Sequence, residues 1–245
     1  MVSPVYSSKG TFNTSATPDP CTFDGAVTLT CPVTVDAGDV LITAVQATYA
    51  SGTVNTITTP AGWTLLNDDL GEGTTRVRKI YYKIADGTED SATFDVTANF
   101  SAAAAGARIS GQVYRFTGAA SGSPVKTTSG GASSGSNDTL TATGVTAGSA
   151  DAIAVMIAFT SSRATGSFTG ETNGDWVQQA TDNNGTTGYI VCQTDELAAS
   201  GQVSGGSYTM AGTTAWRTFT FYIEAPGGGS LLIPRSTMQS HHIFR

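Results

Sequence analysis

Apolar and polar residues alternate with a period of two in short runs along most of the chain. The runs end at Gly, Asn, Asp or Pro, which is typical of strands separated by turns. No window shows a 3.6-residue period, so the pattern predicts an all-β protein. We expect strands over residues 26–30, 39–48, 63–67, 75–84, 92–98, 108–116, 139–143, 152–159, 176–180, 187–193, 202–208 and 216–224. Strands at this spacing indicate a sandwich or jelly roll.

The second half of the chain repeats the pattern of the first at an offset of about 110 residues. The matches are residues 38–42 with 150–154, Trp63 with Trp176, residues 80–82 with 190–192, and Tyr114 with Tyr222. We expect the halves to form one sandwich, because each has an apolar face that the other can cover. The alternative is chance similarity between Thr-rich β segments. The prediction is a jelly-roll-like β-sandwich of about twelve strands built from two pseudo-repeated halves.

Two segments depart from the strand pattern. Residues 127–137 read TTSGGASSGSN, a low-complexity stretch that we predict to be a loop or an exposed crossover. After Glu224 the composition changes again, so we divide the chain into a β-sandwich domain, residues 1–225, and a Gly-rich linker with a C-terminal tail, residues 226–245.

The tail is apolar and weakly basic, and we expect it to anchor the protein to a partner surface. The predicted contact residues are Leu231, Leu232, Ile233, Arg235, Ile243, Phe244 and Arg245. The alternative is a frayed terminus.

Composition narrows the choice of partner. The chain has 40 Thr, 24 Ser and 29 Gly, a mixture that favours strands and turns over helices. Its 12 basic and 19 acidic residues give a net charge of -7, which argues against a nucleic-acid partner. The longest apolar run, residues 152–159, is far too short for a membrane helix, so no membrane partner is expected.

The first ten residues lack the basic and apolar regions of a signal peptide. We therefore expect a protein made in the cytosol or released by lysis. Cys21 and Cys31 are close enough in sequence to bridge an N-terminal hairpin, but a reducing compartment favours free thiols, with Cys192 a buried apolar residue.

Few residues of this chain suit catalysis. Both histidines, His241 and His242, lie in the tail, so the β body lacks an imidazole for nucleophilic hydrolysis or for a His-rich zinc site. The cysteines form no CxxC pair, and no phosphate-binding glycine motif occurs. We expect no enzyme, no metal and no cofactor.

Carboxylates are the remaining candidates for chemistry. They cluster at Asp68, Asp69 and Glu72, at Asp86, Glu89 and Asp90, and at Asp195 and Glu196. A glycosidase needs two carboxyl groups facing each other across a cleft, whereas we predict every cluster to lie in a hairpin loop, where acids stabilise turns. Calcium binding at residues 68–72, or by Asp182, Asn183 and Asn184, is the alternative to turn chemistry.

Two further groups of side chains allow two interpretations each. Trp63, Trp176 and Trp216 would bind sugar if exposed, but their places beside strands favour core positions. Arg76, Arg78, Lys79 and Lys83 share one predicted strand, which is either a solvated face or an interface with an acidic neighbour.

Five motifs resemble those of a known domain family. They are GDVLITAV at residues 38–45, TPAGWTLL at 59–66, IYYKIADG at 80–87, VYRFTGA with SPV at 113–119 and 123–125, and ADAIAV at 150–155. In this order they resemble a β-sandwich domain of tailed-bacteriophage virion proteins, which also occurs in bacterial surface or secreted proteins. The resemblance covers about residues 25–224 and does not include the tail.

The resemblance implies a structural or adhesive virion domain without catalytic residues. The compact body, the lack of coiled-coil heptads and the apolar tail favour a capsid decoration or cement protein on the particle surface. The implied partners are other capsid or tail subunits, with copies of this chain forming a homo-oligomer, and the implied location is the virion, assembled in the host cytoplasm. One alternative is a tail-fibre or tail-tip adhesin that binds a host glycan or receptor. Another is a bacterial extracellular matrix module, which the lack of a signal peptide disfavours.

Overall fold

The protein is an all-β structure in which strands account for most of the chain. The computed structural model describes residues 3–16, 24–49, 52–67, 74–101, 107–148, 150–160, 176–183, 189–197 and 203–226. These residues form fourteen strands and no helix. The strands are β1 (Val5–Lys9), β2 (Asn13–Ala16), β3 (Asp24–Thr30), β4 (Val40–Thr48), β5 (Val54–Ile57), β6 (Thr64–Asn67), β7 (Arg76–Ile84), β8 (Thr93–Phe100), β9 (Arg108–Thr117), β10 (Val125–Thr146), β11 (Ala152–Thr160), β12 (Val177–Asn183), β13 (Tyr189–Leu197) and β14 (Val203–Ile223).

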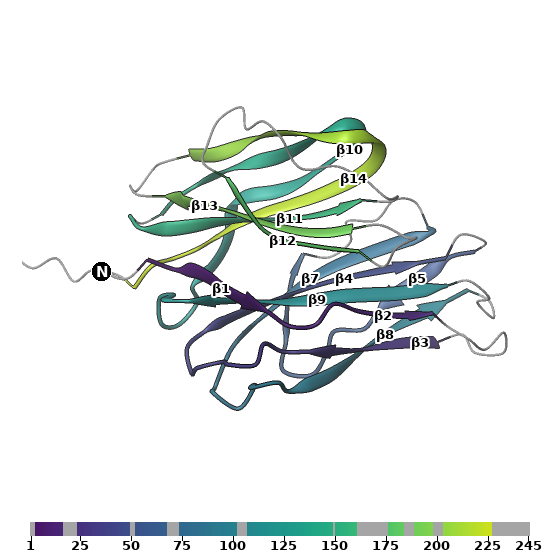
Figure 1. The fold of residues 1–245 in the computed structure, drawn as a ribbon, viewed down its shortest axis with the longest axis horizontal. Coiled ribbons are helices and arrows are strands. Elements are labelled where there is room, and N and C mark those ends of the chain that lie inside the picture. Colours follow the sequence, from purple (N-terminus) through teal and green to yellow (C-terminus); the bar gives the residue numbers. More distant parts are fainter. Residues whose placement is uncertain are drawn as a thin grey trace, which may run out of the picture.

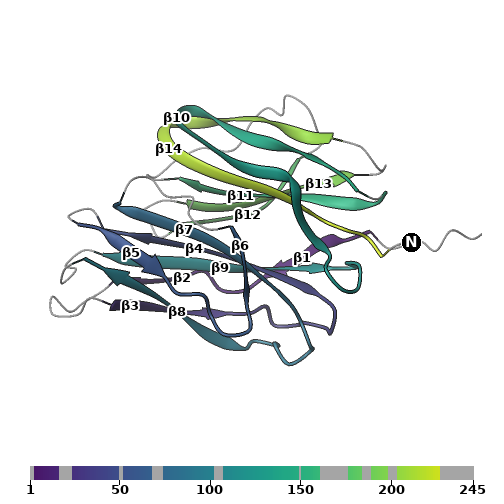
Figure 2. The ribbon, with the colours of Figure 1, turned by 180° about the vertical axis from the view of Figure 1, so that it is seen from behind.

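The strands form two large sheets, each built by one half of the chain. The first inner sheet has the order β1-β9-β4-β7-β6, with β2 continuing the line of β1 along β9. The second inner sheet has the order β10-β14-β11-β13-β12. All of these pairs are antiparallel, and Figure 2 shows the short β6 at the edge beside β7.

Each inner sheet has a cover on its outer side. The first cover is the small sheet β3-β8-β5. The second cover is made by the far parts of β10 and β14, residues 139–146 and 203–209, which pair with each other. The molecule is therefore a stack of four layers, in which the two inner sheets lie in the middle (Figure 1).

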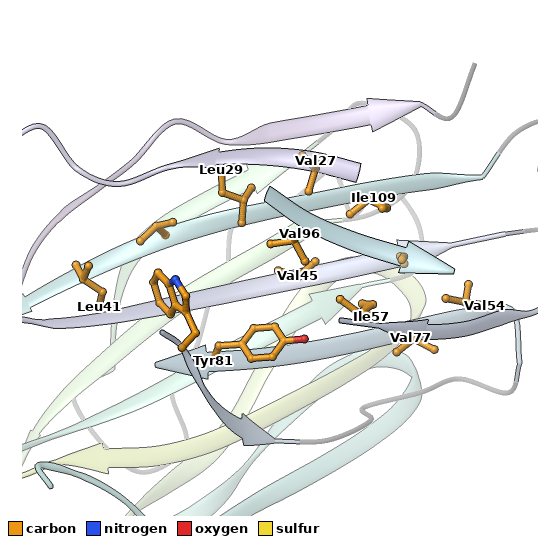
Figure 3. Close-up of a cluster of buried hydrophobic side chains, with 14 of the residues drawn as sticks. Val27, Leu29, Leu41, Val45, Val54, Ile57, Val77, Tyr81, Val96 and Ile109 are labelled. Atoms are coloured by element: carbon orange, nitrogen blue, oxygen red, sulfur yellow. The ribbon is translucent and has the colours of Figure 1, made fainter. Parts of the chain in front are cut away.

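Three apolar clusters fill the spaces between these layers. The first cover cluster joins β3, β5 and β8 to the first inner sheet, with Leu29, Val96 and Tyr81 among its members (Figure 3). The shared cluster joins the two inner sheets and contains Ile42 and Phe221. The second cover cluster lies beyond the second inner sheet. Its members are Leu140, Val145, Ala147, Ala152, Ala154, Met156, Ala158, Trp176, Val191, Leu197, Trp216 and Tyr222.

The central strand of the first inner sheet shows why the layers stack. All nine residues of β4 are buried. Leu41 and Val45 point into the first cover cluster, while Ile42 and Ala44 point into the shared cluster, as the alternation of a strand requires. A strand that is apolar on both faces needs a layer on each side.

The second cover arises from a bend in one long ribbon. β10 and β14 pair over most of their length, but the register shifts between Asn137, opposite Thr214, and Thr139, opposite Thr209. Residues 210–213 of β14 lie opposite a single residue of β10, and an irregularity of this kind bends the strand. Beyond the bend the Thr218 hydroxyl donates a hydrogen bond to the Thr141 carbonyl at 2.7 Å. This bond holds the ribbon over its own sheet, and the bend is visible at the top of Figure 1.

The predicted repeat is present in the order of the strands. We number the five strands on the main path of each inner sheet in chain order, leaving β2 aside. Both sheets then have the same spatial order: strand one at the edge, then five, two, four and three. Trp63 and Trp176 each directly precede the third strand, and each lies in the cover cluster of its own half. Ile80 and Ile190 both lie in the shared cluster. The halves therefore stack back to back.

Two of the residue matches are wrong. Ile42 faces the shared cluster but Ala154 faces the second cover cluster, and the same difference separates Tyr114 from Tyr222. Matching Asp39 to Asp151 puts the two strands out of phase by one residue, which in a strand exchanges the faces.

The sandwich class is confirmed, but its arrangement differs from the expectation. The halves share one cluster, and each also has a cover of its own, so there are four layers where we expected a single sandwich. The jelly-roll connectivity stays a prediction.

Most predicted strands are confirmed, and the differences have physical causes. The segments 202–208 and 216–224 belong to one strand, β14. The strands β1, β2 and β5 were not predicted, because they are short and rich in Ser, Thr and Asn.

The prediction of a loop over residues 127–137 is wrong, because this segment belongs to β10 and pairs with β14. The glycine at position 135 of this segment is required by its neighbour on β14. A Cβ on Gly135 would lie 2.5 Å from Cζ2 of Trp216, so the close approach of the indole ring requires glycine there.

We expect Trp63→Ala and Trp176→Ala each to lower the free energy of unfolding by about 3–5 kcal/mol, the usual cost of removing a buried indole. The two losses should add in the double variant, because the rings lie in different clusters with the inner sheets between them. Denaturant unfolding measures all three values. If the alanine variants do not fold, Trp→Phe substitutions give the same comparison, and strong coupling between the two sites would contradict the layered arrangement.

Candidate functional site

The acids of the turn after β7 stabilise that turn. The Glu89 carboxylate accepts hydrogen bonds from the backbone N–H groups of Asp86, Gly87 and Thr88 at 3.1–3.2 Å. Lys83 Nζ lies 2.6 Å from Glu89 Oε1. Asp86 accepts a hydrogen bond from the Thr88 hydroxyl at 2.6 Å. The predicted turn chemistry is confirmed for Asp86 and Glu89, whereas the Asp90 carboxylate accepts a hydrogen bond from the backbone N–H of Val35, in the loop before β4.

These contacts shift two pKa values. The hydrogen bond to Glu89, together with its charge, raises the pKa of Lys83 above its ordinary 10.5. The hydrogen bonds from Thr88 lower the pKa of Asp86 below its ordinary 3.8. Both shifts favour the charged forms, so the turn is most stable when both groups are ionised.

A second ion network holds the start of β4. Arg115 donates from Nε to Asp39 Oδ2 at 2.6 Å and from Nη2 to Asp36 Oδ2 at 2.8 Å. The backbone N–H of Asp36 also donates to Asp39 Oδ2, at 2.8 Å. Asp39 and Arg115 are both buried, so the pair ties the loop before β4 to β9 inside the protein.

The residues of the motifs that carry the sequence resemblance have structural roles. Gly38, with φ +93°, turns the chain so that Asp39 can reach Arg115. Gly62, with φ +79°, places Trp63 against the ring of Phe94, with the ring centroids 4.8 Å apart. These motif residues form turns and core contacts.

The tryptophans do not form a sugar platform. Trp63, Trp176 and Trp216 are 8%, 4% and 2% exposed, which confirms the prediction that they are core residues. An indole stacks on a sugar only when its face is accessible, so a glycan would have to bind through other side chains.

The third acidic pair occupies an unexpected position. Asp195 and Glu196 lie within β13, so the prediction that every acidic cluster lies in a loop is wrong here. Consecutive residues of a strand project to opposite faces, and Asp195 is buried whereas Glu196 is exposed. The two carboxylates therefore do not face each other as a glycosidase pair requires.

A small cavity lies beside this pair at the edge of the second inner sheet. Its volume is about 260 Å³, and it is lined by Val177, Gln179, Thr194, Asp195 and Glu196. Gln179 Nε2 donates to Thr194 Oγ1 at 2.7 Å, so these two polar groups bind each other. None of the described residues that line the cavity is aromatic.

The basic strand β7 is not a solvated face throughout. Arg78 is completely buried between the two inner sheets, where Nε donates to Gln46 Oε1 at 2.8 Å. Its guanidinium carbon lies 6.0 Å from the centre of the Phe159 ring. The interpretation of a solvated strand face is therefore wrong for Arg78, because the second half of the chain covers this residue.

Other predicted site residues lie outside the described residues. These are Asp68, Asp69, Glu72, Cys21, Asn184, both histidines and all seven contact residues of the tail, namely Leu231, Leu232, Ile233, Arg235, Ile243, Phe244 and Arg245. The strand β12 includes Asp182 and Asn183, whose side chains are likewise not described.

The described residues show neither a metal-binding cluster nor a membrane-spanning helix. No group of three or more His, Cys, Asp and Glu side chains in this part of the chain is arranged to hold a metal ion. Within the same residues, no helix has the length and hydrophobicity to span a membrane.

Cys31 and Cys192 are free, buried thiols, as predicted. Burial, with a contribution from the charge of Glu89, raises the pKa of Cys31 to about 11. Burial also raises the pKa of Cys192.

Comparison with known proteins gives no relative. No family model, no curated protein and no solved structure matches the chain. The functional argument therefore depends on the residues themselves.

We expect Glu89→Gln to lower the free energy of unfolding by about 1–3 kcal/mol, because the amide keeps the size of the side chain but loses the charge that its donors bind. The part due to Lys83 is present below pH 10.5 and disappears as the pH rises through the raised pKa of Lys83. Glu224→Gln is the control, since Glu224 lies 3.4 Å from Lys126 in a partly exposed pair worth under about 1 kcal/mol. Equal losses in the two variants would contradict this role for Glu89.

In a Cys21→Ser variant, we expect the native protein to react slowly with a thiol reagent at pH 8. A pKa of about 11 in place of 9.0 lowers the thiolate fraction of Cys31 about 100-fold. In denaturant both thiols should react fast. A fast-reacting thiol in the native protein would show that one of them is accessible.

Proposed function

We propose that the protein is a bacteriophage virion structural protein, and more specifically a capsid decoration or cement protein displayed on the particle surface. Its partners in this proposal are other virion proteins and further copies of this chain. Its location is the virion, assembled in the host cytoplasm.

One observation carries the proposal: the residues of the motifs form turns and core contacts of the fold. Asp39 accepts a hydrogen bond from a backbone N–H and pairs with Arg115, while Trp63 fills a core cluster. A domain whose characteristic residues build turns and packing suits a structural role, because catalysis needs such groups to face a substrate. The two inner sheets and their covers form a thick β body of the kind that serves for surface display.

The tail supplies the attachment in this proposal. Leu231, Leu232, Ile233, Ile243 and Phe244 would each contribute about 1.5–3 kcal/mol on full burial, before an ordering cost of about 1–2 kcal/mol per residue. The net gain for one chain is modest. Many copies on one particle would raise the effective concentration and keep the contacts formed. Arg235 and Arg245 would add contacts to an acidic partner surface, weakened by salt.

The adhesin alternative has less support. A host glycan is usually bound by exposed aromatic rings, and the three tryptophans are buried. The decoration proposal needs no such surface.

We expect deletion of residues 227–245 to leave the body folded and to reduce the copies on purified particles at least about tenfold, because the anchor is lost while the described strands end at Ile223. Circular dichroism and a thermal melt measure folding, and quantitative mass spectrometry of the particles measures occupancy.

A full-length variant provides the control for this deletion. Replacing Leu231, Leu232 and Ile233 by Ser keeps the length of the chain and should also lower occupancy. Particles that carry either variant at wild-type occupancy would refute the anchor. A protein that never enters particles, even as wild type, would refute the virion assignment.

A further inference from the structure

The cavity at the edge of the second inner sheet lies where β12 begins. β12 is the last strand of this sheet, and its first residue, Val177, pairs with Thr194. β13 continues for three residues beyond that pair, through Asp195 and Glu196 to Leu197. The described part of β12 does not run along these three residues, so side chains from both faces of β13 line the same cavity.

The walls of this cavity include one apolar and one acidic surface. Val177 is 56% exposed, and only two other large hydrophobic residues of the described part of the chain, Val5 and Val33, are exposed as well. Glu196 is exposed, so its carboxylate is accessible to a ligand. The volume of about 260 Å³ is below the range of about 300–1,000 Å³ that is usual for small-molecule pockets. The cavity therefore suits a single basic side chain that follows an apolar segment.

The described part of the chain ends close to this cavity. Ile223, the last residue of β14, pairs with Ile153, which pairs on its other side with Glu196. Adjacent strands lie about 4.8 Å apart, so the backbone of Ile223 is about 10 Å from that of Glu196. The backbone N–H of Glu224 donates to the Pro124 carbonyl at 2.9 Å, which fixes the chain at this point.

The linker of the tail has the right length for this distance. Residues 227–230 read GGGS, a composition that behaves as a flexible coil. Four such residues span about 10–12 Å on average, so residue 231 can reach the cavity. A site within reach of its own tail meets that tail at a local concentration in the millimolar range. A weak contact is then enough, whereas the tail of a second copy in dilute solution would need a much stronger one.

The next residues of the tail match the two surfaces of the cavity. Residues 231–233 read LLI, and Pro234 and Arg235 follow. A proline favours an extended conformation of the residue before it and is itself tolerated at the edge of a sheet. Residues 227–245 contain two arginines and no acid, whereas the whole chain has a net charge of -7. The tail and the cavity are thus complementary in charge.

We propose that the cavity is the docking site of the chain's own C-terminal tail. In the docked state, residues 231–233 contact Val177 at the edge of β12, and the Arg235 guanidinium pairs with the Glu196 carboxylate. The apolar contact is small and the ion pair is exposed, so docking is reversible. On a particle the same tail residues would contact the partner surface, so docking is a property of the free protein. The inference therefore does not depend on the virion assignment.

Disulfide trapping in the full-length protein tests this proposal. The trapping variant carries Val177→Cys and Leu232→Cys in a Cys21→Ser background, in which the two remaining thiols are buried. A disulfide needs Cβ atoms about 3.5–4.5 Å apart, so its rate of formation with oxidised glutathione reports how often the tail lies at β12. We expect a disulfide within one chain, which mass spectrometry identifies. Val177 is exposed and residue 232 follows the last described strand, so both substitutions should leave the body folded.

Matched variants separate docking from free movement of the tail. Thr97→Cys with Leu232→Cys places the first thiol on the exposed side of β8, in the first cover, and should form the disulfide at least about tenfold more slowly. Glu196→Gln, added to the trapping variant, should slow trapping about two- to fivefold, the usual effect of losing an exposed ion pair. Asp24→Asn removes an exposed charge from the first cover and should leave the rate unchanged. Circular dichroism confirms that each variant is folded.

Three results would overturn the proposal. A disulfide that joins two chains would assign the cavity to the tail of a second copy. The absence of a disulfide, or equal rates with the cysteine at position 177 and at position 97, would mean that the tail has no preference for this edge. Equal trapping with and without the Glu196 carboxylate would exclude the cavity as the site that holds the tail.

Discussion

The burial of the first inner sheet on both faces is the constraint on which the rest of the structure depends. β4 pairs with β7 and β9 along its whole length, and none of its nine residues is exposed. A sheet of this kind is stable only between two other layers. The small sheet β3-β8-β5 supplies one layer and the second half of the chain supplies the other. The apolar sequence of β4 therefore requires the second half of the chain as a cover, and the shared cluster is the contact that results.

Close packing between the layers explains several small residues. A Cβ on Gly111 would lie 2.9 Å from Cδ1 of Leu29 and 3.1 Å from the Ala44 carbonyl oxygen, so the first cover approaches β9 closely because glycine is there. Gly135 gives the same access to Trp216. The ion networks of Asp39 and Glu89 then fix the loops at the ends of β4 and β7. Packing sets the layers, and the buried charges hold the turns between them.

Much of this fold could be predicted from the sequence, because the apolar residues of strands such as β4 and β11 form continuous runs. The burial of Trp63 and Trp176 followed from their position directly before strands, and that of Trp216 from its place in the closing strand. The glycine- and serine-rich part of β10 could not be predicted, since its stability comes from pairing with β14 and from the ring of Trp216, both distant in sequence. The burial of Arg78 was missed for the same reason, because only the stacking of the halves places Phe159 beside its guanidinium.

The path of β14 has a consequence for synthesis of the protein. The first inner sheet has all its strands once β9 has left the ribosome, whereas the second inner sheet lacks its second position, between β10 and β11, until β14 is made. The same late strand supplies half of the second cover. During translation the strands of the first half can pair with one another, but Ile42, Ile80 and Phe116 stay uncovered until the second half supplies their partner layer. The nascent chain therefore exposes an apolar sheet face for the time needed to make its second half, and this interval is when neighbouring nascent copies are most prone to associate.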